Sequence, residues 1–90
     1  MMLLSVWIQI VSGGEVYKGN FVLEMTKPLT LKKVIKKIGK AKTIKLEKKL
    51  LDEKTITILL NQHVVDYPKD SDFLLKGGDT LDIIQHIMGG

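Results

Sequence analysis

With 90 residues, 44% of them apolar and 27% charged, the chain has the size and composition of one small globular domain. It contains no cysteine, which excludes a disulfide framework, a thiolate nucleophile and a thiolate metal site. The apolar stretch from Met1 to Val11 is interrupted by Ser5 and Gln9 and has no basic leader. We therefore expect no signal peptide and no membrane span, but a cytoplasmic protein with a single domain over residues 1–90.

The formal charge of +4 at pH 7 is unevenly distributed, and all fourteen basic residues are lysines. Residues 27–54 hold eleven lysines against three acids, a net charge of +8, whereas the rest of the chain has a net charge of −4. Such a segment can follow a phosphate backbone, which would make the chain a basic nucleic-acid-binding module. Because it lacks arginine for bidentate contacts and aromatic residues for stacking, we favour a solvated helix face and expect no nucleic-acid partner.

The chain opens with a pattern typical of a hairpin. Apolar and polar residues alternate from Leu4 to Ile10, the period of a strand with one buried face, and Trp7 falls on the opposite face. Gly13 and Gly14 can both take positive φ values, and Val16 to Met25 reads as the second strand.

A short amphipathic helix is predicted next, with Thr30 as its N-cap and Gly39 as its C-terminal stop. Its apolar residues have helical spacing, and the lysines between them should face water. The apolar residues are Leu31, Val34, Ile35 and Ile38. The lysines are Lys32, Lys33, Lys36 and Lys37. A second helical turn is expected through Leu46 to Leu51, where Leu46, Leu50 and Leu51 share a face.

Three further strands are expected in the C-terminal part. Thr55 to Leu60 is β-branched and alternating, Asn61-Gln62 supplies turn residues, and Val64 to Tyr67 reads as a short return strand. After a loop and a tight turn at residues 76–79, Thr80 to Gln85 makes the last strand, with Leu81 and Ile83 toward the helix. This order predicts an α+β fold in which a mixed sheet of four to five strands packs on one main helix.

The printed sequence ends in Gly89-Gly90, directly after the last predicted strand. Two residues without side chains leave the backbone free to thread a narrow channel in another protein's active site. We therefore expect residues 87–90 to be a flexible tail, and the ending alone leaves two readings open: a tail that presents the Gly90 carboxylate for chemistry elsewhere, or a frayed end that happens to carry small residues.

In its C-terminal third the sequence resembles the ubiquitin-like β-grasp sulfur carriers, the MoaD/ThiS-like family of the molybdopterin synthase small subunit and the thiamine-biosynthesis carrier. The matching pieces, in order, are the strand Ile56 to Leu60, Asn61-Gln62, Val64-Val65, the Gly77-Gly78-Asp79 turn, an apolar strand and Gly89-Gly90. The resemblance implies the β-grasp fold.

Two features leave the pathway open. The stretch from Ile84 to Ile87 is closer to the thiamine type, since molybdopterin-type carriers tend to have a proline pair before the tail. The chain length and the insertion from Lys40 to Lys54 are closer to the molybdopterin type. The sulfur could serve thiamine biosynthesis, molybdopterin or tungstopterin biosynthesis, or tRNA thiolation.

The resemblance implies a carrier with no catalytic residue and no bound cofactor. A partner activating enzyme would use ATP to adenylate the Gly90 carboxylate, and a sulfur donor protein would displace AMP to leave a thiocarboxylate (a 1-thioglycine) for a sulfur-accepting synthase. Gly90 would carry the reacting atom and Gly89 would give access.

Partner binding is assigned to the open sheet face. Its candidate residues are Trp7, Leu59, Ile84, His86 and Met88. Trp7 has two readings, a partner hot spot or a side chain that covers the sheet edge or reaches the core. The two histidines have no companions at ligand spacing, so a metal site is not expected; His86 reads as a surface or interface residue and His63 as solvated.

Two other functions share parts of this pattern. A ubiquitin-like protein modifier would use the same Gly90 adenylate but join it to lysines of other proteins. An enzyme acting alone is disfavoured, because no paired carboxylates, Ser/His/Asp set or phosphate-cradling glycine loop is recognisable.

Overall fold

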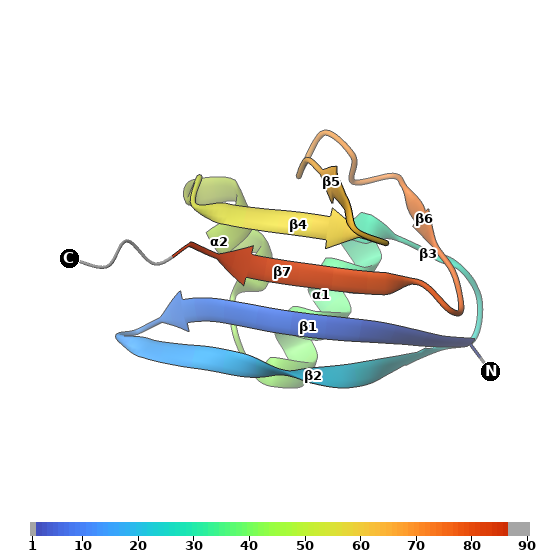
Figure 1. The fold of residues 1–90 in the computed structure, drawn as a ribbon, viewed down its shortest axis with the longest axis horizontal. Coiled ribbons are helices and arrows are strands. Elements are labelled where there is room, and N and C mark those ends of the chain that lie inside the picture. The colour runs from blue at the N-terminus through green and yellow to red at the C-terminus, as the bar shows by residue number, and fades with distance from the viewer. Residues whose placement is uncertain (1, 87–90) are drawn as a thin grey trace.

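The structure, a computed structural model, describes residues 2–86, and within them five strands form a mixed sheet with both helices on one face (Figure 1). The strands of this sheet are β1 (Met2–Ser12), β2 (Glu15–Met25), β4 (Ile56–Leu60), β5 (His63–Val65) and β7 (Thr80–Gln85). Their order across the sheet is β2-β1-β7-β4-β5. The central pair, β1 and β7, is parallel, and the other neighbours are antiparallel. The predicted four- to five-stranded sheet is confirmed.

The core lies between this sheet and the helix α1 (Leu31–Lys42). Alternate residues of β1 and β7 point inward, and the predicted inward positions of Leu81 and Ile83 are confirmed, since both have 0% exposure. Inward residues of the two central strands pair in register, as Val6 does with Leu81. Burying one such aliphatic side chain contributes about 1.5–3 kcal/mol, so the central strands supply much of the stability.

Helix α1 begins as predicted and ends later than predicted. The Thr30 hydroxyl accepts a hydrogen bond from the Lys33 backbone N–H at 3.3 Å, which confirms the N-cap. The predicted stop at Gly39 is wrong, because the helix continues to Lys42 and is capped by Thr43 in the left-handed conformation. Gly39 is instead a point of close approach, since a Cβ there would lie 2.9 Å from the carbonyl oxygen of Ile44.

The predicted second helical turn is a helix, α2 (Leu46–Asp52). Leu46 and Leu50 are buried, but Leu51 is 45% exposed, so the prediction that all three share a face is wrong for Leu51. Each helical residue turns by about 100°, which places Leu51 well around the helix from Leu50. Neither helix among residues 2–86 is long and apolar enough to cross a membrane.

The segment after β4 differs from its predicted form in two ways. The return strand ends at Val65, and Tyr67 instead packs against the core, with its hydroxyl donating to Oε2 of Glu47 at 2.6 Å. Burial and this acidic partner raise the pKa of Tyr67. A two-stranded pair of β3 (Leu29–Thr30) and β6 (Leu74–Leu75), not predicted, closes the end of the domain where β7 begins.

Candidate docking face and anchor of the C-terminal segment

The predicted site residues fall into two groups. Trp7, Leu59 and Ile84 lie on the sheet face opposite the helices and are half-buried there, and exposed His86 follows directly after β7. Met88, Gly89 and Gly90 lie outside the described residues. The open face, as the term is used below, is the sheet surface made by Trp7, Leu59 and Ile84 with their cross-strand neighbours.

An acidic side chain that the sequence reading missed occupies the middle of the open face. Asp82 on β7 stands opposite Trp7 on β1 and opposite Leu59 on β4. Leu59 in turn pairs with Val64 of β5, which is 68% exposed. The alternation within Thr80–Gln85 already put Asp82 on the same side as Ile84, so this signal was present in the sequence. The row from Trp7 to Val64 is therefore apolar apart from this carboxylate, whereas Ile84 lies between the polar residues Gln9 and Thr57.

Trp7 also forms part of a shallow hollow of about 300 Å³ on this face. The hollow is lined by Ser5, Val6, Trp7, Asn20, Phe21, Val22, Thr80 and Asp82. The residues that line it include two aromatic rings, those of Trp7 and Phe21, the exposed Val22 and the carboxylate of Asp82. A surface of this kind can receive an apolar side chain or a cationic one from another molecule.

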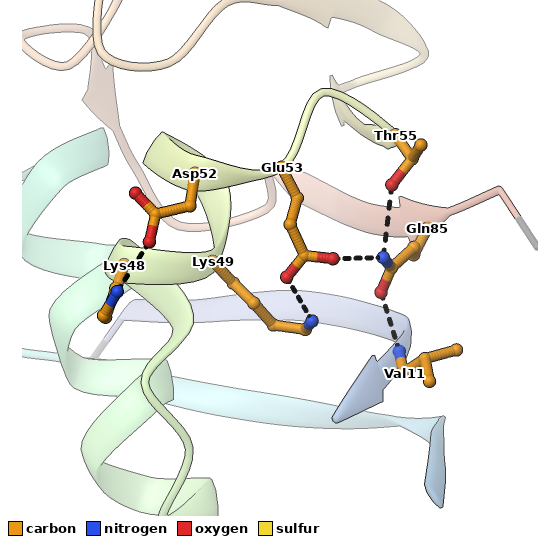
Figure 2. A network of polar contacts seen from close by, with 7 residues as sticks. All are labelled: Val11, Lys48, Lys49, Asp52, Glu53, Thr55 and Gln85. Carbon is orange, nitrogen blue, oxygen red and sulfur yellow. Dashed lines mark hydrogen bonds and ion pairs between the residues drawn. The ribbon is translucent and has the colours of Figure 1, made fainter. Parts of the chain in front are cut away.

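The end of β7 is held by a buried side chain, Gln85, on the helix side of the sheet (Figure 2). Its carbonyl oxygen accepts from the backbone N–H of Val11 at 2.8 Å. Its amide nitrogen donates to Glu53 at 2.8 Å and to the Thr55 hydroxyl at 3.2 Å. Both amide hydrogens are thereby used, and the side chain ties β7 to β1, to the residue after α2 and to the start of β4.

Glu53 is itself fixed by Lys49, whose ammonium group lies 2.5 Å from Oε2 of the carboxylate (Figure 2). The hydrogen bonds from Lys49 and then from Gln85 lower the pKa of Glu53. Glu53 therefore remains an acceptor for the Gln85 amide at neutral pH.

On the other side of β7, the backbone N–H of His86 donates to the carbonyl of Thr55 at 2.9 Å, and its Nε2 lies 3.0 Å from the Thr57 hydroxyl. The main chain is thus hydrogen-bonded up to the last described residue, and Gly90 is only four positions after His86 in the sequence. No group of three metal-ligating side chains occurs among residues 2–86.

The turn residues that carry the resemblance lie at the opposite end of β7. The Asn61 side chain donates to Asp79 and accepts from the Thr80 backbone N–H at 2.9 Å. Asp79 is only 5% exposed and accepts from the Lys76 backbone N–H at 2.8 Å. Gly78 has a φ of +88°, a conformation that strongly favours glycine. These residues lock two turns together.

Comparison with known proteins finds a matching family and similar solved structures. The model of the ThiS family matches residues 15–90. No curated protein matches the chain. One similar solved structure is the protein-protein complex of subunits 1 and 2 of the molybdopterin-converting factor from Helicobacter pylori, with a TM-score of 0.57 and 24% identity over 99% of this chain and 100% of that one. Another is Urm1 from Trypanosoma brucei, with a TM-score of 0.60 and 20% identity over 98% of this chain and 95% of that one. Both likenesses confirm the predicted β-grasp fold.

Proposed function

The chain belongs to the ThiS family of ubiquitin-like sulfur carriers, and we propose that it carries sulfur as a thiocarboxylate on the terminal carboxyl group of Gly90. The observation that carries this proposal is the extent of the family match, which runs to Gly90 and so includes both terminal glycines. The anchored end of β7 supports it, because that strand leads directly into the four residues that end at Gly90.

The chemistry requires an activated acyl group, because a carboxylate would have to expel oxide. A partner activating enzyme transfers AMP from ATP to the Gly90 carboxylate and releases pyrophosphate. The outer sulfur of a persulfide on a sulfur donor protein then attacks the acyl carbon, and the bond to AMP breaks. A thiol reductant cleaves the S–S bond that still joins this sulfur to the donor, which leaves a thiocarboxylate on Gly90. The partner supplies the catalytic groups, so this chain acts as a carrier rather than an enzyme.

The hydrogen bonds of Gln85 and His86 support this proposal, because they fix the point from which the proposed reactive segment starts. Residues 87–90 span four positions after His86, and a fully extended chain of that length reaches at most about 14 Å. Because Gln85 and His86 are both hydrogen-bonded to neighbouring strands, the distance from the open face to the carboxylate is limited by this short reach. A partner that holds the open face can therefore receive Gly90 in its own active site.

We assign the docking of these partners to the open face, with Trp7, Leu59 and Ile84 as the apolar contacts and His86 and Met88 continuing toward Gly90. Tryptophan is enriched among the residues that dominate binding energy, and Trp7 lines the hollow described above. The Helicobacter pylori relative is described as a complex of two subunits, which supports a synthase-type partner for this chain as well. The sulfur acceptor in this proposal belongs to the biosynthesis of a sulfur-containing cofactor or to tRNA thiolation.

Intact-protein mass spectrometry tests the proposal. The chain is incubated with extract of its native cells, ATP and a sulfur donor, beside a variant that lacks Gly90. We expect a mass increase that equals the replacement of one oxygen by sulfur, located on Gly90 by fragmentation and absent from the truncated variant. Larger adducts joined through Gly90 would instead identify a protein modifier, and no change with a confirmed activating enzyme present would reject both.

A further inference from the structure

The outer edge of β2 is a long strand edge that no other strand covers among residues 2–86. β2 has eleven residues and ends the sheet on one side, whereas the opposite edge strand, β5, has three (Figure 1). Three apolar side chains of β2 are exposed: Val16 by 56%, Tyr17 by 37% and Val22 by 55%. Long uncovered edges of this kind are templates for pairing with another strand.

The backbone hydrogen bonds of β1 determine which backbone groups of β2 point outward. In β1 the backbone N–H and C=O groups of the odd-numbered residues point toward β7. The Ser5 N–H donates to the Asp79 carbonyl, and the Leu3 carbonyl accepts from the Gly78 N–H. The even-numbered residues of β1 therefore bond to β2, where their partners are odd-numbered, as Val6 pairs with Phe21. The outward N–H and C=O groups consequently belong to the even-numbered residues of β2. These are Val16, Lys18, Asn20, Val22 and Glu24.

We propose that this edge binds a second copy of the chain, with two β2 strands pairing antiparallel about a two-fold axis at Phe21. In a two-fold interface the same contact occurs twice. With the axis at Phe21, a residue that precedes Phe21 by a given number of positions lies opposite the residue of the other copy that follows Phe21 by the same number. Lys18 of each copy therefore lies opposite Glu24 of the other. The outward-facing even-numbered residues then stand opposite one another, as hydrogen bonding between the strands requires.

Charge selects this register over its neighbours. Lys18 and Glu24 are both exposed and lie on the same sheet face, so the symmetric pairing forms two opposite-charge cross-strand pairs. Moving the axis by one residue places Lys18 opposite Val22 or Thr26 and loses both pairs. The same register places Leu23 of one copy opposite Gly19 of the other. A Cβ added at Gly19 would have no atom within 4 Å, so the leucine of the second copy has room there.

Positive charge near this edge weakens the proposed dimer. Lys37 and Lys40 line a hollow beside Glu24 on the same edge, and the chain has a net charge of +4, so like charges oppose association. A reversible dimer that depends on concentration is therefore expected. β1 separates β2 from β7, so the anchored end at Gln85 and His86 lies outside the new strand pair. The hollow beside Trp7 borders that pair, because Asn20, Phe21 and Val22 line it.

Sedimentation velocity on the full chain, from low micromolar to about 1 mM, tests this dimer. The unmodified protein should show a dimer population that rises with concentration. Lys18→Glu and Glu24→Lys should each weaken dimerisation about tenfold or more, because each places like charges opposite twice. The matched control is Lys69→Glu, which makes the same charge change as Lys18→Glu at an exposed loop position, and it should leave the dimer intact.

The decisive sample is an equimolar mixture of the two single variants. Their net charges are +2 and +6, so they repel overall, yet a mixed dimer restores both opposite-charge pairs. We expect the mixture, and likewise the double variant Lys18→Glu/Glu24→Lys, to recover dimerisation. A monomer at every concentration, or a dimer that both single variants leave unchanged, would overturn the proposal. Because no activating enzyme is present, the outcome is independent of the sulfur-carrier function.

Discussion

The side-chain amide of Asn61 donates a hydrogen bond of 3.1 Å to Oδ1 of Asp79, and this contact joins two turns that are 18 residues apart in sequence. Asp79 is buried and also receives hydrogen bonds from Lys76. We predict that Asp79→Asn lowers the free energy of unfolding by about 1.5–3 kcal/mol, because one of the donors then faces an amide NH₂ group. Urea unfolding at pH 7 measures this loss. Exposed Asp72→Asn is the control and should have little effect.

The same carboxylate should make stability depend on pH. Burial acts to raise the pKa of Asp79, but hydrogen bonds from Lys76 and Asn61 outweigh burial and leave this pKa below its usual value. Because this pKa is lower in the folded state, the contribution of the Asp79 carboxylate to the free energy of unfolding is complete at pH values above the pKa in the unfolded state. It is lost as the pH falls through the pKa in the folded state. The stability difference between the unmodified protein and Asp79→Asn should therefore be constant near neutrality and shrink below about pH 4. A difference that does not change with pH would contradict this.

Gln85→Leu should loosen the end of β7. The substitution removes the acceptor of the Val11 N–H and the donor to Glu53 while it keeps the volume of the side chain. We expect a loss of about 1–3 kcal/mol in the free energy of unfolding and faster hydrogen exchange at the Val11 amide. Gln9→Leu, at a half-buried position on the other face of the sheet, is the matched control. Unchanged exchange at Val11 would show that this side chain does not hold the strand.

Gly39→Ala should destabilise the protein although alanine is the better helix former by about 1 kcal/mol. The new Cβ would lie 2.9 Å from the carbonyl oxygen of Ile44, and a backbone atom cannot move aside without moving the connection between α1 and α2. We expect a net loss of about 1–3 kcal/mol, measured by thermal unfolding. A stabilised variant would mean that the two helices can separate slightly at no cost. Lys36→Ala, exposed on the same helix, controls for helix propensity.

Trp7→Ala should weaken docking to the activating enzyme and leave the chemistry of Gly90 intact. Loss of a central aromatic contact costs about 2 kcal/mol or more, which corresponds to roughly a thirtyfold rise in KM for the carrier at little-changed kcat. Steady-state adenylation kinetics measure both constants. Leu51→Ala removes an exposed apolar side chain on α2, away from the open face, and should leave KM unchanged. If Trp7→Ala and Leu51→Ala changed KM equally, the activating enzyme would not dock at Trp7.

The elements whose signal is local could be predicted from the sequence. Alternation from Leu4 to Ile10 and from Thr80 to Gln85 reports a strand with one buried face, and both strands lie at the centre of the sheet. Helical spacing and the Thr30 cap likewise identified α1. Each of these signals depends only on residues that are close in the sequence, and the tertiary structure contains the element that each signal predicts.

Features that depend on contacts between distant residues could not be predicted. Gly39 looked like a helix stop because glycine often ends helices, but its role depends on how closely the chain at Ile44 returns. For Gln85 the local pattern predicts only a strand residue, since its hydrogen-bond partners Val11 and Glu53 are 74 and 32 residues away in the sequence. The open face was placed correctly for Trp7, Leu59 and Ile84, while the binding role of these residues stays a prediction.

The central claim, that Gly90 bears the sulfur, is tested most directly on protein isolated from its own cells without reductant. Top-down mass spectrometry with fragmentation of the C-terminal residues gives both the last residue and its mass. We predict that Gly90 is the last residue of the mature protein and that a fraction of the molecules carries sulfur in place of one oxygen at its carboxyl group. A mature chain that continues past Gly90, or a Gly90 carboxyl group that contains only oxygen in cells with an active sulfur pathway, would contradict the claim.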